Sequence, residues 1–93
     1  MPVDESGLER FIGALLEGRR GQCAAMVDHY LSRQLPVVEI YEHLFKPALY
    51  RIGDLWAAER LSPASEHMAS GIIEALINEI HPRMVPGVRK PLR

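Results

Sequence analysis

One tryptophan, one acid and one histidine are spaced so that they could contact a flat ligand. Trp56 is the only tryptophan of the chain, and the pair Glu66-His67 follows it after nine residues. An aromatic plate beside a carboxylate and an imidazole can bind a large flat molecule by stacking and hydrogen bonding. Each residue alone has an ordinary explanation, because single tryptophans are usually well buried and lone histidines usually pack or lie at the surface. The pattern therefore predicts a binding site only if the fold brings the three side chains together.

Small and polar residues extend this candidate site. Ser70 and Gly71 follow the Glu-His pair on one face of a predicted helix, and their small size would let another body approach closely. A solvated face would explain the same strip, which also carries Glu74 and Asn78. Gly53 lies one helical turn before the tryptophan. The candidate ligand contacts are Trp56, Glu66, His67, Ser70 and Gly53.

The position of Glu66 is unusual for a carboxylate. On a helical wheel it projects onto a continuous apolar arc made of Ala69, Ile72, Ile73, Leu76, Ile77 and Ile80. A carboxylate near the core is costly unless it is paired, hydrogen-bonded or close to water. Its place in the first turn offers an ordinary explanation, because the helix dipole favours an anion there. A ligand contact and a first-turn structural role both stay open.

Two amphipathic helices are predicted in the first third of the chain. The first starts at Ser6, an N-cap residue that Glu9 would join in a capping box, and ends at Gly18 as a C-terminal glycine. The second spans about residues 21–34. Each carries apolar residues at helical spacing, which predicts burial against neighbouring helices.

Two longer helices follow and position the candidate site. The third spans about 36–58, and Pro47 predicts a kink or a break because proline removes a hydrogen bond and clashes with the preceding turn. Ser62-Pro63 is a strong start for the fourth helix, which Pro82 is predicted to end near residue 81. Short connections and the lack of strand alternation predict an all-α fold, an antiparallel four-helix bundle. The tryptophan and the Glu-His pair then gather at one end of it.

Length and composition limit the chain to one small domain. It has 93 residues, of which 47% are hydrophobic and 25% are charged, an ordinary globular mixture. No run approaches the ~18 apolar residues of a membrane span, and the N-terminus carries no signal-peptide pattern. The single cysteine excludes an intrachain disulfide framework and fits a reducing cytoplasm, which is the predicted localisation.

Charge divides the chain into two parts. Residues 82–93 contain four basic residues, no acidic residue and three of the seven prolines, whereas the remainder has seven basic and twelve acidic residues. An acidic body argues against direct nucleic-acid contact. We predict a helical domain over residues 1–81 and a basic, proline-rich linker over residues 82–93.

No motif indicates an enzyme. The sequence contains no nucleophile elbow, no phosphate-binding loop and no Cys-His pair. A ferritin-like metal site needs Glu-x-x-His on two helices, and this pattern does not occur. Glu39 and His43 are four residues apart and could pair on one helix, but a single pair makes no metal site. We therefore expect neither a catalytic residue nor a metal ligand.

The spacing of the candidate residues resembles a motif of cobalamin-binding regulators. The run GDLW, nine residues and then Glu66-His67 is similar to the Trp-x9-Glu-His motif of light-sensing transcription factors that use adenosylcobalamin. The wider stretch 41–73 resembles the helical cap module of cobalamin-binding domains generally, which also occurs in methionine synthase and in corrinoid methyltransferase systems. The resemblance covers roughly residues 6–82.

The resemblance implies roles for these residues. In the family a four-helix bundle lies over the upper face of the corrin ring. Trp56 would pack against the upper axial group, and Glu66 and His67 would contact the adenosyl moiety or its surroundings. The complete triplet favours the sensory branch, because methyl-transfer caps usually carry other residues there. In sensory members a histidine directly after the tryptophan can ligate cobalt after light, and Ala57 at that position argues against this adduct.

The resemblance also implies a second half of the cobalamin site. In the family a Rossmann-like domain follows the cap, and the histidine of its Asp-x-His-x-x-Gly motif is the lower cobalt ligand. None of the four histidines stands in such a motif. We therefore expect tight cobalamin binding to need a Rossmann-like domain, attached through residues 82–93 or supplied by a partner chain. Alone, the cap would expose the apolar patch that covers the corrin, which would allow self-association.

Three functions stay open at this point. The first is a cobalamin-binding cap in a regulatory or sensory protein, which covers the upper axial face of adenosylcobalamin. The second is the cap of a corrinoid methyl-transfer protein. The third is a helical interaction or dimerisation domain without a cofactor, which leaves the Trp-Glu-His spacing as a coincidence. The first predicts that Trp56, Glu66 and His67 converge on one exposed end of the bundle.

Overall fold

Five α-helices and one π-helical turn make up the part of the chain that the structure describes. The computed structural model covers residues 3–84, the last four by their backbone alone. The elements in order are α1 (Glu5–Leu16), α2 (Arg20–Ser32), α3 (Val37–Ile40), η1 (Tyr41–Phe45), α4 (Lys46–Ala57) and α5 (Pro63–Met84). The predicted all-α helical bundle is confirmed. No helix among these is both long and apolar enough to cross a bilayer.

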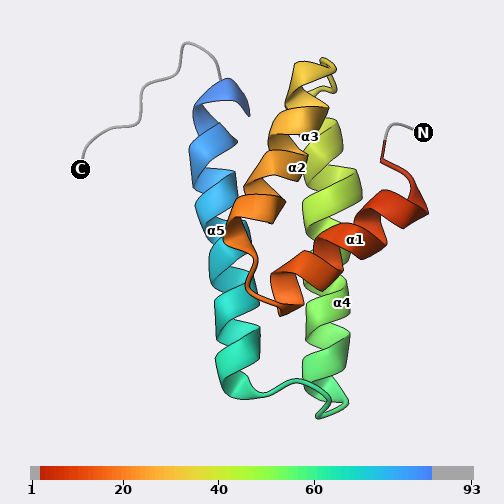
Figure 1. The fold of residues 1–93 in the computed structure, drawn as a ribbon, viewed down its shortest axis with the longest axis vertical. Coiled ribbons are helices and arrows are strands. Elements are labelled where there is room, and N and C mark those ends of the chain that lie inside the picture. Colours follow the sequence, from red (N-terminus) through yellow and green to blue (C-terminus); the bar gives the residue numbers. More distant parts are fainter. Residues whose placement is uncertain (1–2, 85–93) are drawn as a thin grey trace.

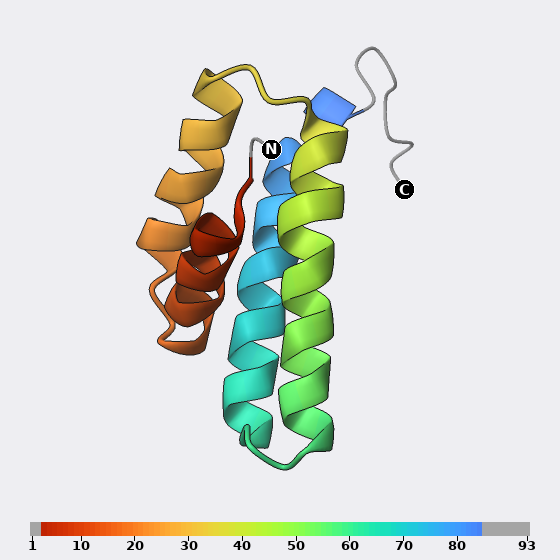
Figure 2. The same ribbon diagram turned by 90° about the vertical axis from the view of Figure 1, so that its right-hand side faces the viewer.

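The helices form two layers (Figures 1 and 2). One layer contains α1 and α2, and the other contains the long antiparallel pair of α3–α4 and α5. Helix α1 crosses α4 and α5 obliquely and contacts both. The lower ends of α4 and α5 extend beyond α1 and α2, so this tip of the molecule has no second layer over it.

The third predicted helix is continuous through Pro47. The backbone stays helical across both junctions of η1, with φ and ψ of −62° and −50° at Tyr41 and of −64° and −49° at Lys46. The predicted interruption therefore takes the form of a π-helical turn that ends just before the proline. A π turn shifts the hydrogen-bond register by one residue, and this accommodates the proline ring and its missing donor without a break.

The start of α1 differs from the prediction. Asp4, and not Ser6, is the N-cap, because its Oδ1 accepts a hydrogen bond of 2.8 Å from the backbone N–H of Gly7. Aspartate and serine are about equally good N-caps, so two candidates two residues apart could not be ranked from sequence. The predicted start of α5 is confirmed, since Ser62 Oγ accepts from the backbone N–H of Ser65 at 3.1 Å.

The end of α5 also differs from the prediction. The helix passes Pro82 and ends at Met84. A proline so close to a helix end disturbs only one carbonyl of the preceding turn, and the last residues can stay helical. The remainder of the predicted linker over 82–93 lies outside the described residues.

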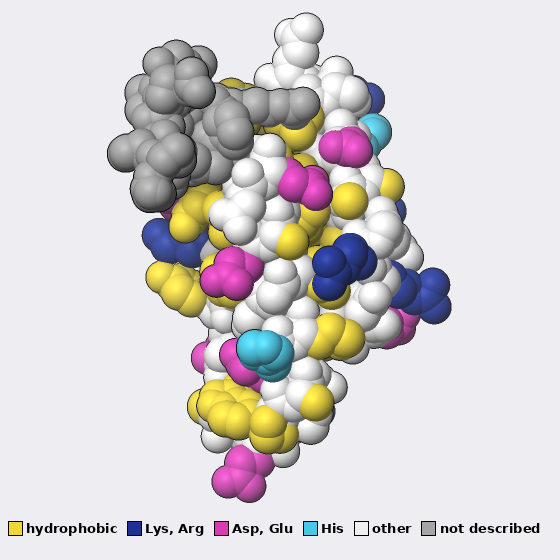
Figure 3. Space-filling view, turned by 90° about the vertical axis from the view of Figure 1, so that its left-hand side faces the viewer, with side chains coloured by type: hydrophobic (Ala, Val, Ile, Leu, Met, Phe, Trp, Pro, Cys, Tyr) yellow, Lys and Arg dark blue, Asp and Glu magenta, His cyan; other side chains and the backbone are white. Residues whose placement is uncertain are grey.

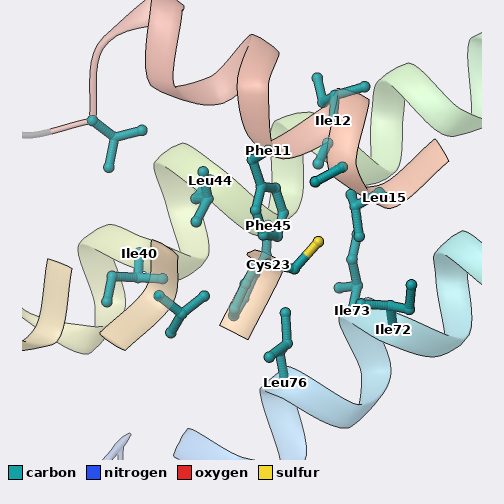
Figure 4. Close-up of a cluster of buried hydrophobic side chains, with 14 of the residues drawn as sticks. Phe11, Ile12, Leu15, Cys23, Ile40, Leu44, Phe45, Ile72, Ile73 and Leu76 are labelled. Atoms are coloured by element: carbon teal, nitrogen blue, oxygen red, sulfur yellow. The ribbon is translucent and has the colours of Figure 1, made fainter. Parts of the chain in front are cut away.

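Apolar side chains from all helices fill the space between the layers (Figure 4). Phe11 of α1 and Phe45 of η1 are fully buried, with ring centroids 6.0 Å apart. The apolar arc of α5 is buried as predicted, apart from Ile77, which is half-buried. Cys23 is buried among these side chains, and burial raises the pKa of its thiol. This core holds α5 against the rest of the molecule and thereby orients its polar face outward.

Candidate functional site

Trp56 lies in the last turn of α4, at the tip that α1 and α2 do not cover. Its side chain is 46% exposed, whereas Ile52, one turn earlier, is buried. An exposed single tryptophan is the opposite of the ordinary expectation of a core anchor. The exposure follows from the extension of α4 and α5 past the other layer (Figure 1).

A tight turn directs the chain from Trp56 back to α5. Helix α4 ends in a Schellman motif, in which the N–H of Glu59 bonds to the carbonyl of Trp56 at 3.0 Å and the N–H of Arg60 to that of Leu55 at 2.9 Å. Glu59 adopts a left-handed conformation with φ of 59°. A shallow hollow lies at this turn, lined by Trp56, Ala57 and residues 59–63. The sequence did not single out this loop as part of the site.

Glu66 and His67 lie in the first turns of α5, at the same end of the bundle as Trp56. Glu66 is half-buried and His67 is exposed. The hydroxyl of Ser70 donates a hydrogen bond of 3.1 Å to Oε2 of Glu66. A carboxylate beside apolar side chains is costly unless it is hydrogen-bonded, paired or close to water. One oxygen of Glu66 is hydrogen-bonded, and the N-terminal end of the helix dipole favours its negative charge.

A groove runs along α5 next to these residues. It is lined by Leu49 of α4 and by His67, Ser70, Gly71, Ile73, Glu74 and Ile77 of α5. The predicted small and polar strip therefore borders a concave surface. Leu49 was missed, although it lies seven residues before Trp56 and so shares its helix face, a signal the sequence does contain.

The five candidate residues do not all lie in one hollow. Trp56 belongs to the hollow at the turn, while His67 and Ser70 line the groove. Glu66 lines neither of the two, and the same is true of Gly53, which is exposed. A Cβ built on Gly53 would meet no atom within 4 Å other than those of its chain neighbours and its own helix backbone, so a larger side chain would fit at this position.

The surface view displays this face of the molecule (Figure 3). Hydrophobic side chains gather at the lower tip, and a histidine and acidic side chains lie directly above them over α5. The face thus combines an exposed aromatic surface, an imidazole, carboxylates and a hydroxyl. Such a set can stack on a flat molecule and hydrogen-bond to its polar groups.

Candidate metal ligands are sparse across the described residues. No group of three or more His, Cys, Asp and Glu side chains there could hold a metal ion. Glu39 and His43 do form the predicted pair on one helix, with Nε2 3.2 Å from Oε1.

The open tip fits one side of a large flat cofactor. The exposed indole of Trp56 offers a stacking surface at the tip. In the groove beside it, the open position at Gly71 lets a flat ligand approach the backbone of α5. The hydrogen-bonded carboxylate of Glu66 and the imidazole of His67 offer polar contacts beside it. These residues could hold one face of the molecule.

Comparison with protein families gives one match. The family described as the B12 binding domain matches residues 8–80, which extend from α1 almost to the end of α5 and include all five candidate residues. Comparisons with curated proteins and with solved structures give no match. Because the matched region covers most of the chain, and its fold is the helical bundle expected of a cobalamin cap, the chain belongs to the B12 binding domain family and is a helical cobalamin-binding cap domain.

Proposed function

We propose that this chain covers the upper axial face of adenosylcobalamin in a regulatory protein and has no catalytic activity of its own. The observation that carries the proposal is the exposed indole of Trp56 at the same bundle end as Glu66 and His67. A tryptophan that served only the core would gain from burial. Its exposure at the bundle end that also carries two polar groups supports a ligand contact instead.

Each of the three residues has a distinct proposed role. Trp56 stacks on or packs against the upper axial group. Glu66 accepts hydrogen bonds from hydroxyl or amino groups of an adenosyl moiety, and the Ser70 hydroxyl on Oε2 leaves Oε1 for the ligand. His67 adds a second polar contact from the exposed face of α5. Bound cobalamin would supply a cobalt–carbon bond, which these residues enclose on one side.

The regulatory role is supported by the complete Trp-Glu-His triplet rather than by the fold. A methyl-transfer cap would share the bundle, so the fold does not separate the two functions. The residue directly after Trp56 is Ala57 and not a histidine, so no imidazole is available there to ligate cobalt. A response to light would therefore have to form its cobalt adduct without this residue.

We further propose that a Rossmann-like domain completes the site. The cap offers one open face to the cofactor, and the lower ligand of cobalt would come from the other domain. Titration of this 93-residue chain with adenosylcobalamin in the dark should leave the cofactor unretained on a desalting column. Stoichiometric retention by the chain alone would contradict the need for a second domain.

The role of Trp56 is tested by substitution in the complete protein. Trp56→Ala should weaken adenosylcobalamin about tenfold to a hundredfold, because stacking of a base on an aromatic side chain contributes about 1–3 kcal/mol. Binding of methylcobalamin, which offers no base to stack, should weaken much less. The measurement is a titration in the dark followed by the visible spectrum.

Tyr50→Ala is the matched control for this test. Tyr50 is a more exposed aromatic residue of the same helix, at 65%, and it lines neither the hollow nor the groove. Its removal should leave both affinities unchanged. An equal loss for both cobalamins in Trp56→Ala would argue against a contact with the upper ligand. Tighter binding of methylcobalamin than of adenosylcobalamin by the unsubstituted protein, together with this equal loss, would favour the methyl-transfer alternative.

A further inference from the structure

The groove between α4 and α5 differs in chemistry from the hollow at Trp56. Leu49, Ile73 and Ile77 contribute apolar surface to it, and all three are buried or half-buried. His67, Ser70 and Glu74 add polar groups from the same side of α5. One wall of the groove is therefore apolar and its margin can form hydrogen bonds.

Glu74 is the acidic group of this margin. It is exposed, and no ion pair or side-chain hydrogen bond joins it to another described residue. Ser70, one turn earlier, directs its hydroxyl to Glu66 instead. The carboxylate of Glu74 thus keeps its acceptor capacity for a donor that enters the groove.

We infer that this groove binds the edge of the corrin ring and that Glu74 accepts a hydrogen bond from one of its primary amides. The inference rests on the proposed function and extends it to a part of the cofactor that Trp56 does not contact. A corrinoid presents methyl groups and neutral primary amides around its rim, which match the apolar wall and the carboxylate respectively. The groove is open at Gly71, because a Cβ built there would meet no atom within 4 Å other than those of its chain neighbours and its own helix backbone. A hydrogen bond to an ionised acceptor is stronger than one between neutral groups.

The test uses two probes that differ only at the rim. Dicyanocobyrinic acid heptaamide carries amides where dicyanocobyrinic acid carries carboxylates, and neither has an adenosyl group. Each is titrated into the ¹⁵N-labelled 93-residue chain, and amide shifts are followed, which detects weak binding as well. The native chain should bind the heptaamide about tenfold or more tightly than the acid, with shifts centred on residues 67–77.

Two variants that each remove one negative charge distinguish a direct contact with Glu74 from general repulsion between the acidic chain and the carboxylates of the acid probe. Glu74→Gln should reduce the preference for the heptaamide several-fold, because a glutamine side chain can also donate to a carboxylate. Glu79→Gln is the control, since Glu79 is exposed on the same helix and does not line the groove. It should change the preference less than about twofold, the shift expected from one distant surface charge.

Several results would overturn the inference. An equal change of the heptaamide preference in both variants would show that the net charge of the chain, and not a contact with Glu74, causes the preference. Amide shifts confined to residues 56–63 would show that the corrin edge binds at the turn and not in the groove. The absence of shifts with both probes would exclude the groove as a binding surface. None of these results bears on the contact of Trp56 with the upper ligand, because the probes lack that ligand and the Trp56 test uses the complete protein.

Discussion

At the scale of single residues, left-handed positions end three of the helices. Gly18, Gln34 and Glu59 have φ of 71°, 64° and 59°, and each follows a helix whose last turn closes in a Schellman motif. Only glycine adopts this conformation without a steric cost. The Glu59 turn therefore stores strain beside the Trp56 hollow, and such strain is often found at functional sites.

Replacing Glu59 by glycine should stabilise the chain. We expect Glu59→Gly to raise the free energy of unfolding by about 1 kcal/mol, because the strain of a left-handed residue is removed. The measurement is urea denaturation followed by far-UV circular dichroism. Gln34→Gly is the matched control after the end of α2, far along the chain from the site, and it should give a similar gain.

Gly18→Ala tests the same idea in the opposite direction. The alanine would keep an unfavourable φ, and its Cβ would lie 2.8 Å from Sδ of Met68, so the chain should lose about 1–2 kcal/mol. No gain in Glu59→Gly, together with a gain in Gln34→Gly, would mean that the Glu59 side chain itself stabilises the turn.

At the scale of elements, an ion pair joins the two layers. Arg51 of α4 donates two hydrogen bonds to the carboxylate of Glu9 in α1, one of 3.1 Å from Nη1 to Oε1. The hydrogen bond from Arg51 lowers the pKa of Glu9, and the charge of the guanidinium acts in the same direction. Both side chains are largely exposed, so water and salt weaken the pair.

The stability that this pair contributes should depend on pH. Because the folded-state pKa of Glu9 is lowered, the contribution is complete above the ordinary glutamate value of 4.5 and is lost as the pH falls through the lowered pKa. Arg51→Met should therefore reduce the melting temperature at pH 7 and have less effect at pH 3. Added salt at pH 7 should also shrink the difference.

Lys46→Met is the control for this prediction. Lys46 pairs with Glu42 at 3.5 Å within one continuous helix, so its removal separates no layers and should have a smaller effect. If the loss in Arg51→Met were the same at pH 3 as at pH 7, packing of the arginine stem rather than its charge would account for it.

At the scale of the whole molecule, one core holds both layers, while the tip that carries the candidate residues extends beyond it. Phe45 lies at the centre of this core, fully buried and in contact with the rings of Phe11 and Tyr41 at centroid distances of 6.0 and 6.3 Å. The tip residues contribute little to this packing. Stability and ligand contact are therefore expected to respond to different substitutions.

Truncation of the central aromatic ring should destabilise the whole bundle. Phe45→Ala should cost about 3–5 kcal/mol, a large part of the 5–15 kcal/mol that is typical of small domains. Tyr50→Ala in the same continuous helix removes an exposed ring and should change stability by less than about 0.5 kcal/mol. Urea denaturation of both variants compares them, and similar losses would contradict the assigned core.

Local sequence patterns predicted the helices, the faces they bury and the residues on which the resemblance to cobalamin-binding caps rests. Apolar residues at helical spacing predicted the buried face of α5, and Ser62-Pro63 predicted its start. These features depend on neighbours along the chain, so a local pattern is sufficient. Two predictions were wrong. The N-cap of α1 was placed at Ser6 because Asp4 and Ser6 are competing signals, and the end of α5 was placed before Pro82 because a proline is a weak stop signal so near a helix end.

The exposure of Trp56 and the groove beside the small and polar strip result from the packing of the helices. Both depend on how far α4 and α5 extend past α1 and α2 (Figure 2). Hydrophobic periodicity within one segment cannot predict this, because it depends on how segments distant in sequence pack together. The same holds for the hydroxyl of Ser70 on Glu66, since a serine four residues after a glutamate can equally well face water. Burial and contact arise when layers pack, and the packing here leaves the tip with Trp56 open.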